Sequence, residues 1–121
     1  MKPKLMQLLV FVGILTTTTY STRMVRAQGE PRRIEVTARR STYEPAEITL
    51  KKGQPVVLVI KSIDVPHGFR LRELKLDARI NKSAPAELSF TPDKTGDFVG
   101  HCSVFCGPGH GGMTLTLHVV E

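Results

Sequence analysis

Tryptophan is absent from this chain of 121 residues, which has only two tyrosines and five phenylalanines. With so few aromatic side chains, the chain offers no platform on which nucleic-acid bases could stack. Two cysteines are too few for the disulfide-dense framework of a small exported scaffold. The length suits one domain and excludes a large enzyme, a repeat array and a multispanning membrane protein.

Acidic residues are absent from the first 27 positions, although four of the 17 basic residues lie there. The other 13 basic residues face 11 acidic ones, which leaves a charge of +2 on residues 28–121, against +6 for the whole chain. Nucleic-acid binding needs a larger basic excess on the folded domain. We therefore predict that the protein has no nucleic-acid partner.

Residues 1–27 have the organisation of a signal peptide. Lys2 and Lys4 precede an apolar run from Leu5 to Leu15. This run has the length of a signal-peptide core and falls short of the roughly 20 residues that cross a bilayer. Val25-Arg26-Ala27 places apolar or small residues at both positions that a signal peptidase reads. We expect cleavage after Ala27.

This leader predicts that residues 28–121 form an exported domain, in the bacterial periplasm or on the outer face of the cytoplasmic membrane. An uncleaved leader would instead anchor the chain through residues 5–20, although the threonines at positions 16–19 make a poor membrane core. Outside the cytoplasm, the two cysteines would be either oxidised or protected by a ligand.

The chain after residue 27 reads as all-β. Apolar and polar residues alternate in most segments, as in half-buried strands, and 56–60 is a continuous apolar run typical of a central strand. No window shows a helical stripe. Seven or eight short strands separated by turns predict a Greek-key β-sandwich. The segments with strand character are 34–39, 48–50, 56–60, 67–71, 74–80, 86–90, 97–102 and 113–119, and 41–45 is expected to be a turn.

One loop, residues 101–113, carries a set of groups that bind soft metal ions. It holds both cysteines and the only methionine that remains after residue 27, in the pattern Cys102-x3-Cys106-x3-His110-x2-Met113. Thiolate, imidazole and thioether together favour copper, and the thioether argues against zinc. The glycines between these residues let the loop fold closely around an ion.

A site of this kind needs a second imidazole, and His67 is the candidate. It lies in Asp64-Val65-Pro66-His67-Gly68-Phe69 and shares its strand parity with Phe69 and Leu71. The side chain is therefore expected to point into the sandwich. In a two-sheet sandwich, the end of this segment can meet the loop 101–113 at the same end of the domain.

This combination of Cys-x3-Cys-x3-His-x2-Met with an upstream Asp-Val-x-His resembles the binuclear copper A (CuA) centre of the cupredoxin family. That centre occurs in subunit II of haem–copper oxidases and in the C-terminal domain of nitrous-oxide reductase. The resemblance covers residues 28–121 and implies a cupredoxin-like sandwich with two copper ions. It implies that Cys102 and Cys106 bridge the coppers, that His67 binds one and His110 the other, and that Met113 and the backbone carbonyl of Val104 are weak ligands.

The resemblance also implies what the protein does. A CuA-type centre passes single electrons and makes no bonds, so the chain is expected to be an electron carrier rather than an enzyme. The implied donor is a c-type cytochrome and the implied acceptor a terminal oxidase or reductase. Val104 stands where oxidase subunits usually have Glu, and the family's electron-entry tryptophan is absent. We therefore expect a free-standing or loosely anchored carrier rather than an ordinary subunit.

Three other interpretations of the loop remain open. A mononuclear type 1 copper site would use His67, Cys106, His110 and Met113, with Cys102 as a bystander. A copper chaperone that delivers metal to an oxidase would use the same ligands in a more open site. Finally, Cys102 and Cys106 could form a disulfide without any metal.

Neighbouring residues are assigned to supporting positions. Asp64 either orients His67 or stabilises its turn. His101 and His118 are expected to point away from the site, and Phe69 and Phe105 are expected to be core or packing residues rather than electron conduits. The pairs Arg32-Arg33 and Arg39-Arg40 are predicted to form a solvated face, with a docking patch for an acidic partner as the alternative.

Overall fold

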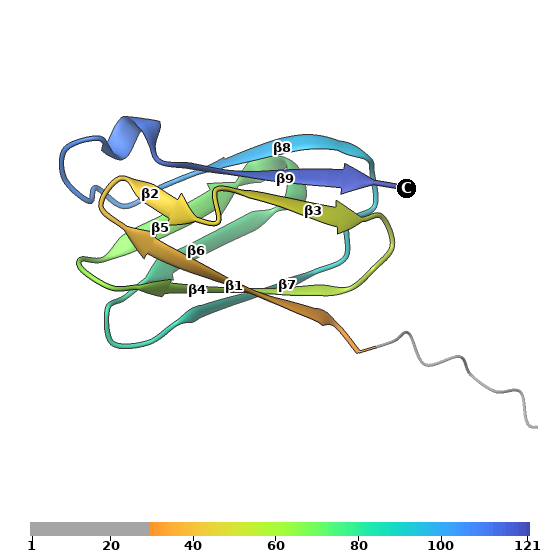
Figure 1. Cartoon of the computed structure of the whole chain (residues 1–121), viewed down its shortest axis with the longest axis horizontal. Coiled ribbons are helices and arrows are strands. Elements are labelled where there is room, and N and C mark those ends of the chain that lie inside the picture. The colour runs from red at the N-terminus through yellow and green to blue at the C-terminus, as the bar shows by residue number, and fades with distance from the viewer. Residues whose placement is uncertain (1–29) are drawn as a thin grey trace, which may run out of the picture.

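The computed structural model describes residues 30–121. In this part of the chain, nine strands form two sheets that pack face to face (Figure 1). Two short 3-10 helices lie in the connections between strands. The prediction of an all-β sandwich is confirmed. The predicted signal peptide, its cleavage after Ala27 and the alternative anchor at residues 5–20 lie outside the described residues. Among the described residues, no helix has the length and apolar character needed to cross a bilayer.

The first sheet has four strands in the order β2-β1-β4-β7. β1 pairs in parallel with β4, whereas the β1–β2 and β4–β7 pairs are antiparallel. β4 is therefore a central strand, which agrees with its continuous apolar run. The bounds are β1 Arg32–Arg39, β2 Thr42–Glu44, β4 Val56–Ser62 and β7 Ala86–Phe90.

The second sheet has five strands in the order β3-β9-β8-β5-β6. β3 and β9 are parallel, and the other neighbours are antiparallel. This sheet carries both segments for which the sequence predicts metal ligands, because β5 begins at His67 and β8 and β9 flank the loop with Cys102, Cys106, His110 and Met113. The bounds are β3 Glu47–Lys51, β5 His67–Leu71, η1 Arg72–Leu74, β6 Leu76–Ile80, β8 Gly96–His101, η2 His110–Gly112 and β9 Thr114–Val120.

The inward side chains of the two sheets form one core. In β9, Leu115, Leu117 and Val119 are buried, whereas the intervening residues are only half-buried. Phe69 is fully buried in β5, as expected. The period-two pattern in the sequence therefore corresponds to real alternation between the core and solvent. Burial of this apolar surface is the main stabilising term of the fold.

Some boundaries differ from the prediction. The segment 41–45, expected to be a turn, contains the short strand β2, so the sandwich has one strand more than the upper estimate. Leu74 belongs to η1 instead of the strand that follows. β8 ends at His101, so Cys102 is already a loop residue. Three-residue elements contain too few positions to show a periodic pattern.

Tyr43 in β2 connects the two sheets. Its side chain is 1% exposed, and its hydroxyl donates a 2.5 Å hydrogen bond to the backbone carbonyl of Gly68. Its ring meets Phe69 edge to face, with the ring centroids 5.8 Å apart. Burial raises the pKa of the Tyr43 hydroxyl, so it remains a donor at all ordinary pH values. The contact fixes the start of β5, where His67 lies.

His118 joins three strands on the outer face of the second sheet. Its Nδ1 lies 2.6 Å from Asp97 of β8, and its Nε2 lies 3.4 Å from Glu47 of β3. The hydrogen bond to Asp97 is the main cause of a raised pKa for His118. The side chain lies on the outer face and away from the metal-binding loop, as predicted.

The two carboxylates make the stability of the sheet depend on pH. Because the pKa of His118 is raised on folding, its contribution is complete below its ordinary value near 6.5 and is lost as the pH rises through the folded-state value. We expect Asp97→Asn to lower the pKa of His118 towards the ordinary value in an NMR titration. Glu47→Gln is expected to lower it less, because that contact is longer. An unchanged pKa in Asp97→Asn would contradict this assignment.

Candidate metal centre

Two segments that are far apart in the sequence meet at one end of the sandwich. The loop between β4 and β5 leads into His67, and the loop between β8 and β9 carries the remaining predicted ligands (Figure 1). The hydrophobic core continues into this end, because Cys102, Cys106 and Met113 belong to the same buried cluster as the strand residues. The site is therefore built on the end of the core rather than on the surface.

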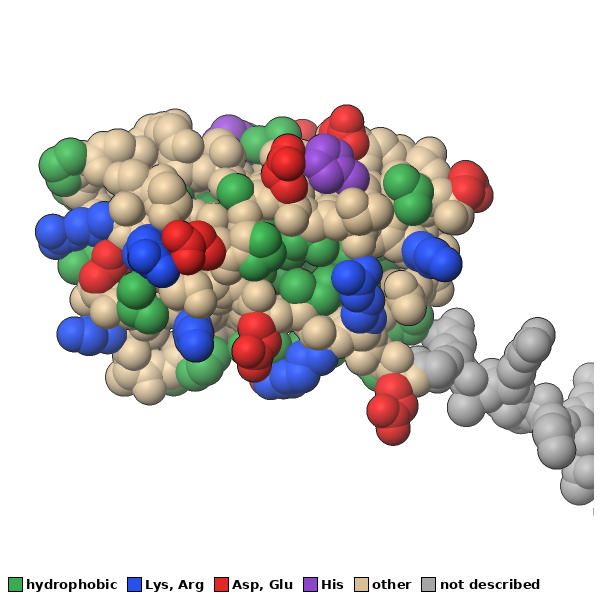
Figure 2. Space-filling view, in the orientation of Figure 1, with side chains coloured by type: hydrophobic (Ala, Val, Ile, Leu, Met, Phe, Trp, Pro, Cys, Tyr) green, Lys and Arg blue, Asp and Glu red, His purple; other side chains and the backbone are tan. Residues whose placement is uncertain are grey.

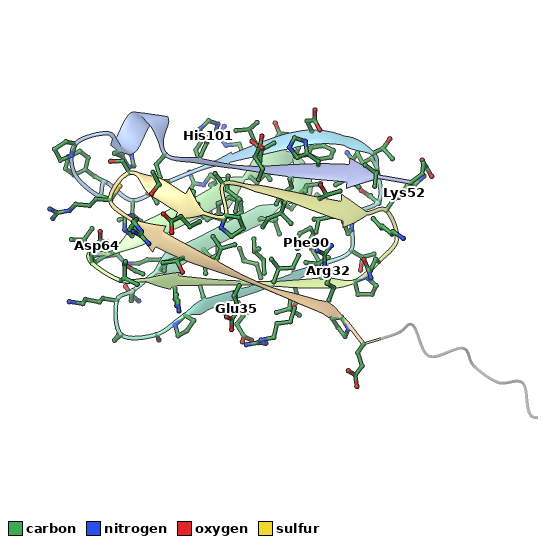
Figure 3. The ribbon with its side chains drawn as sticks, in the orientation of Figure 1. Arg32, Glu35, Lys52, Asp64, Phe90 and His101 are labelled. Atoms are coloured by element: carbon green, nitrogen blue, oxygen red, sulfur yellow. The ribbon has the colours of Figure 1, made fainter. Side chains whose placement is uncertain are left out.

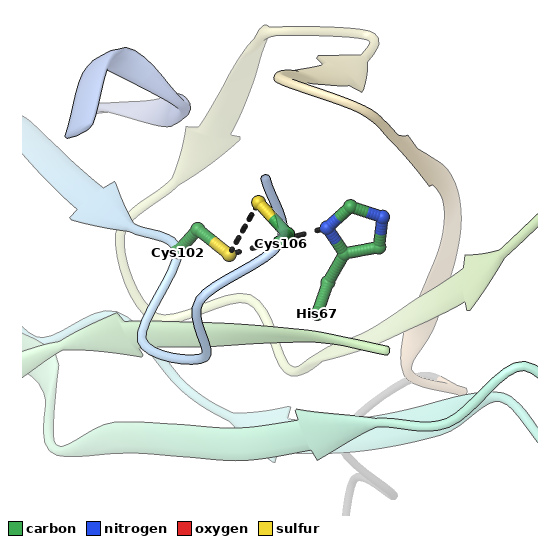
Figure 4. A group of neighbouring side chains, drawn as sticks. All are labelled: His67, Cys102 and Cys106. Carbon is green, nitrogen blue, oxygen red and sulfur yellow. Dashed lines mark hydrogen bonds between the residues drawn. The ribbon is translucent and has the colours of Figure 1, made fainter. Parts of the chain in front are cut away.

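The two thiols lie at the centre of the predicted ligand side chains, which we call the cluster: His67, Cys102, Cys106, His110 and Met113. Cys102 and Cys106 are 6% and 5% exposed, and their sulfur atoms lie 3.6 Å apart (Figure 4). Both cysteines are free, and a disulfide would need a separation of about 2.05 Å. The structure thus contains two adjacent thiols in place of the disulfide that was one open interpretation.

His67 approaches the thiols from β5. It is fully buried, and its Nδ1 lies 4.0 Å from the sulfur of Cys102. The nitrogen and the two sulfur atoms all lie within 4.8 Å of one another, a spacing that one metal ion can bridge. Among residues 30–121, this is the one group of three such side chains gathered at metal-binding distance.

Asp64 determines how the His67 ring is oriented. Its carboxylate lies 2.8 Å from Nε2 of His67 and accepts hydrogen bonds of 2.6 Å from the amides of Arg40 and Val65. Partial burial opposes ionisation of Asp64, but these hydrogen bonds outweigh it and lower its pKa to about 2. An ionised carboxylate only accepts, so the ring proton lies on Nε2 and the lone pair of Nδ1 faces the thiols. Both open roles of Asp64 are thus present.

The other thiol is surrounded by the remaining two side chains of the motif. The sulfur of Cys106 lies 3.5 Å from Nδ1 of His110 and 3.7 Å from the sulfur of Met113. Met113 is fully buried and His110 half-buried. All predicted side-chain ligands are therefore next to one of the two cysteines.

The backbone of the loop supplies the last predicted donor. The carbonyl oxygen of Val104 lies 3.1 Å from the sulfur of Cys102. The loop is closed by a 3.1 Å hydrogen bond from the amide of Cys102 to the carbonyl of Met113. Gly109 has φ +83°, a conformation that favours glycine, and it leads into η2, which begins at His110. The structure brings together all six predicted groups.

The surroundings of Cys106 favour its neutral, protonated form. Burial, and then the neighbouring Cys102 thiol, raise the pKa of Cys106, and the guanidinium of Arg40 counteracts this only in part. Without a metal, the Cys106 thiol is therefore neutral at physiological pH. A cation would stabilise both thiolates and displace their protons, which couples binding to pH.

The structure agrees with most of the predictions for the residues around the cluster. His101 is exposed on the outer face (Figure 3) and points away from the cluster, as expected. The four arginines at positions 32, 33, 39 and 40 are exposed, which agrees with a solvated face. Phe105 was expected to be a core or packing residue; its ring packs against His110, but the side chain is 79% exposed and lies outside the core. The flanking Val104 and Cys106 take the inward positions.

Comparison with known proteins places the chain in a family. Residues 7–114 match the family described as cupredoxin-like domain. A cytochrome c oxidase subunit 2 from Thermus thermophilus is 29% identical over 79 residues, which are 65% of this chain and 58% of that protein. A nitrous-oxide reductase from Ralstonia nicotianae is 30% identical over 77 residues, which are 60% of this chain and 12% of the reductase. The chain thus spans only part of the length of either relative.

Solved structures show the same fold. The periplasmic domain of subunit II of cytochrome oxidase from Bradyrhizobium japonicum has a TM-score of 0.69 at 21% identity, over 74% of this chain and 84% of that one. Auracyanin A, a "blue" copper protein from Chloroflexus aurantiacus, has a TM-score of 0.61 at 20% identity, over 74% of this chain and 99% of that one. At these identities, the likeness establishes the fold alone.

Gly68 provides a test of how the loop is held in place. A Cβ at Gly68 would lie 2.2 Å from the hydroxyl of Ser103 and 2.9 Å from the amide of Val104, whereas a Cβ at Gly111 would meet no atom within 4 Å. We expect Gly68→Ala to displace the loop and to destabilise the fold by about 1–3 kcal/mol in denaturant titrations. Copper affinity should fall in parallel.

The matched control is Gly111→Ala, because Gly111 lies in the β8–β9 loop that Gly68→Ala is expected to displace. It should retain both the stability and the copper affinity of the parent chain. Equal effects of the two substitutions would show that the loop is not positioned by its contact with β5.

Proposed function

The chain belongs to the family of cupredoxin-like domains, and from this premise we propose that it is a one-electron carrier with a binuclear, CuA-type copper centre. The proposed ligands are His67, Cys102, Cys106, His110, Met113 and the carbonyl oxygen of Val104. The observation that carries the proposal is the contact between two buried, free thiols that each have a separate imidazole beside them. The proposal concerns electron transfer and not catalysis.

The donor set fits copper. Two thiols, two imidazole nitrogens and a thioether are soft or borderline ligands, which suit copper and disfavour magnesium, calcium or manganese. The thioether of Met113 is fully buried with its sulfur next to Cys106, and a thioether is an uncommon ligand for zinc. The carbonyl of Val104 is directed towards the thiol of Cys102, so a weak oxygen donor is also at hand.

The position of Cys102 favours two copper ions over one. In a mononuclear type 1 site, Cys102 would be a bystander, and nothing would require its thiol to face the ligands. In the structure its sulfur is next to both the imidazole of His67 and the thiol of Cys106, at 4.0 and 3.6 Å. A thiol in this position is well placed to bridge two ions, since each thiolate has several lone pairs to share.

The protein's own part in electron transfer is to hold this geometry. Bound copper supplies the orbital that accepts and releases a single electron. His67 is held by Asp64, Met113 is enclosed by the core, and the loop is closed on itself by the bond between residues 102 and 113. Groups held in this way move little when charge changes, and water is excluded from the thiols. Both effects lower the reorganisation that electron transfer requires.

The proposed setting follows from the relatives. The carrier would take electrons from a c-type cytochrome and pass them to a respiratory oxidase or reductase, because relatives of the chain are an oxidase subunit and a nitrous-oxide reductase. Export to the periplasm, or to the outer face of the cytoplasmic membrane, is proposed from the leader at residues 1–27. A copper-delivery module is less consistent with ligands that are nearly all buried.

Copper stoichiometry and electron paramagnetic resonance test the proposal. For the full chain loaded with copper, we expect two copper ions per chain and one unpaired electron that is split equally by two copper nuclei. Cys102→Ser should bind one copper with a single-nucleus spectrum, because the second bridge is lost. His101→Ala is the control and should behave like the parent chain, since His101 is exposed and outside the cluster.

Two other outcomes would contradict the proposal. A single copper in the parent chain, unaffected by Cys102→Ser, would establish the mononuclear site. Absence of tightly bound copper, together with a disulfide between the two cysteines, would leave a sandwich without a metal function.

A further inference from the structure

Positive charge is concentrated at the end of the sandwich that carries the cluster. Five basic side chains lie on the strand ends and loops of this end, and all are exposed. In the view of Figure 2, several Lys and Arg side chains lie at the end with the β8–β9 loop, with acidic side chains among them, and others lie towards the opposite end. We call this group the basic rim: it consists of Arg39, Arg40, Lys61, Arg79 and Lys82.

The acidic residues of this end do not neutralise the basic rim. Glu44 pairs with Arg39 at 2.8 Å, and Asp64 accepts its bonds from His67 and two backbone amides. Within residues 30–121, no carboxylate lies within 4.0 Å of the side-chain nitrogens of the other four members of the rim. The rim therefore presents positive charge that the described fold leaves unpaired.

An exposed aromatic side chain lies on the same end. Phe105 is 79% exposed, the highest value among the large exposed hydrophobic side chains of the described residues. Its ring contacts His110 with the centroids 5.5 Å apart. Exposing a phenylalanine to water is unfavourable and is typical of surfaces that bind another molecule.

A hollow joins the basic rim to the cluster. It has a volume of about 310 Å³, and Arg40, Arg79, Phe105 and Cys106 all line it. A carboxylate that entered this hollow would meet two guanidinium groups, which bind carboxylates well because of their planar, forked geometry. It would also come to rest against the residues that surround the thiols.

From these observations we propose that this end docks a protein with an acidic surface patch, with Phe105 as the apolar contact and the basic rim as its charged border. An apolar centre inside a polar border is the usual anatomy of a protein interface. The inference rests on the proposed function, since the docked protein would be the electron-transfer partner. Docking here would bring that partner against Phe105 and His110, beside the cluster.

The charge distribution would also orient the partner before contact. The opposite end carries Lys51, Lys52 and Lys94 together with acidic residues such as Glu121 and Asp93, so its charges largely cancel. An acidic protein would therefore be drawn to the basic rim, and the association rate would fall as salt screens the attraction.

A single cytochrome in two charge states tests the proposal. Native cytochrome c is basic, and succinylation of its lysines makes the same haem protein acidic. Binding of each form to the immobilised, metal-free full chain measures docking without electron transfer, and stopped-flow reduction of the copper-loaded chain measures transfer. At low salt, we expect the succinylated form to bind more tightly and to react about tenfold faster than the native form. This preference should vanish at high salt.

Charge reversals locate the surface. Lys61→Glu, Arg79→Glu and Lys82→Glu together should abolish the preference for the succinylated form. Arg40 is left unchanged because it influences Cys106. The control reverses three lysines at the opposite end, Lys51, Lys52 and Lys94, and changes the net charge equally. It should retain the preference.

The outcomes separate the docking inference from the proposed function. If both cytochromes transfer electrons but the native form is preferred, or if both triple variants behave alike, the docking inference is overturned and the function stands. If neither form transfers electrons although the succinylated form binds through the rim, the proposed function fails and the docking surface stands. Rim-dependent binding to phosphatidylglycerol vesicles, without any preference between the cytochromes, would assign the rim to a membrane and overturn the inference.

Discussion

His67 has no access to water, and a buried ring nitrogen without a partner would be costly. Asp64 meets this need on one side of the ring, at 2.8 Å, and is itself held by amides from two separate turns. The opposite nitrogen is left facing the thiols. Because this one hydrogen bond sets the direction of the ring, the arrangement of the whole cluster depends on it. Tyr43 supports the same region by binding the carbonyl of Gly68, one residue further along the chain.

The candidate site is built from the same kind of buried, apolar side chains as the rest of the core. Cys102, Cys106 and Met113 continue the apolar interior of the sandwich, and the same burial that excludes water also raises the pKa of the Cys106 thiol. A bound cation would stabilise the thiolate of Cys106 against this burial, so metal binding at the cluster would release a proton. Two polar groups at the border of the cluster act on it: Asp64 orients His67, and the guanidinium of Arg40 lowers the pKa of Cys106.

The sequence was informative where residues repeat or cluster. Alternation located the long strands, and the spacing from Cys102 to Met113 identified donors that the fold does bring together. Tyr43 was missed because a lone aromatic residue among polar neighbours shows no period, and its role exists only through contacts with β5. The exposure of Phe105 could not be predicted, because this residue lies in the loop after β8, where buried and exposed positions do not alternate as they do in a strand. The basic rim assembles from three separate segments, 39–40, 61 and 79–82, so no local pattern could reveal it.

Five of the six proposed donors lie within the twelve residues from Cys102 to Met113, in a loop bounded by the antiparallel pair β8 and β9. Only His67 comes from elsewhere. The loop therefore supplies nearly all of the site by itself. Its two ends are fixed by the pairing of β8 with β9, which would persist around a loop of different sequence. Evolution, or an engineer, could exchange the insert and change the metal centre while the sandwich and its single imidazole stay in place. The number of metal ions in such a fold would then be a property of one loop rather than of the whole domain.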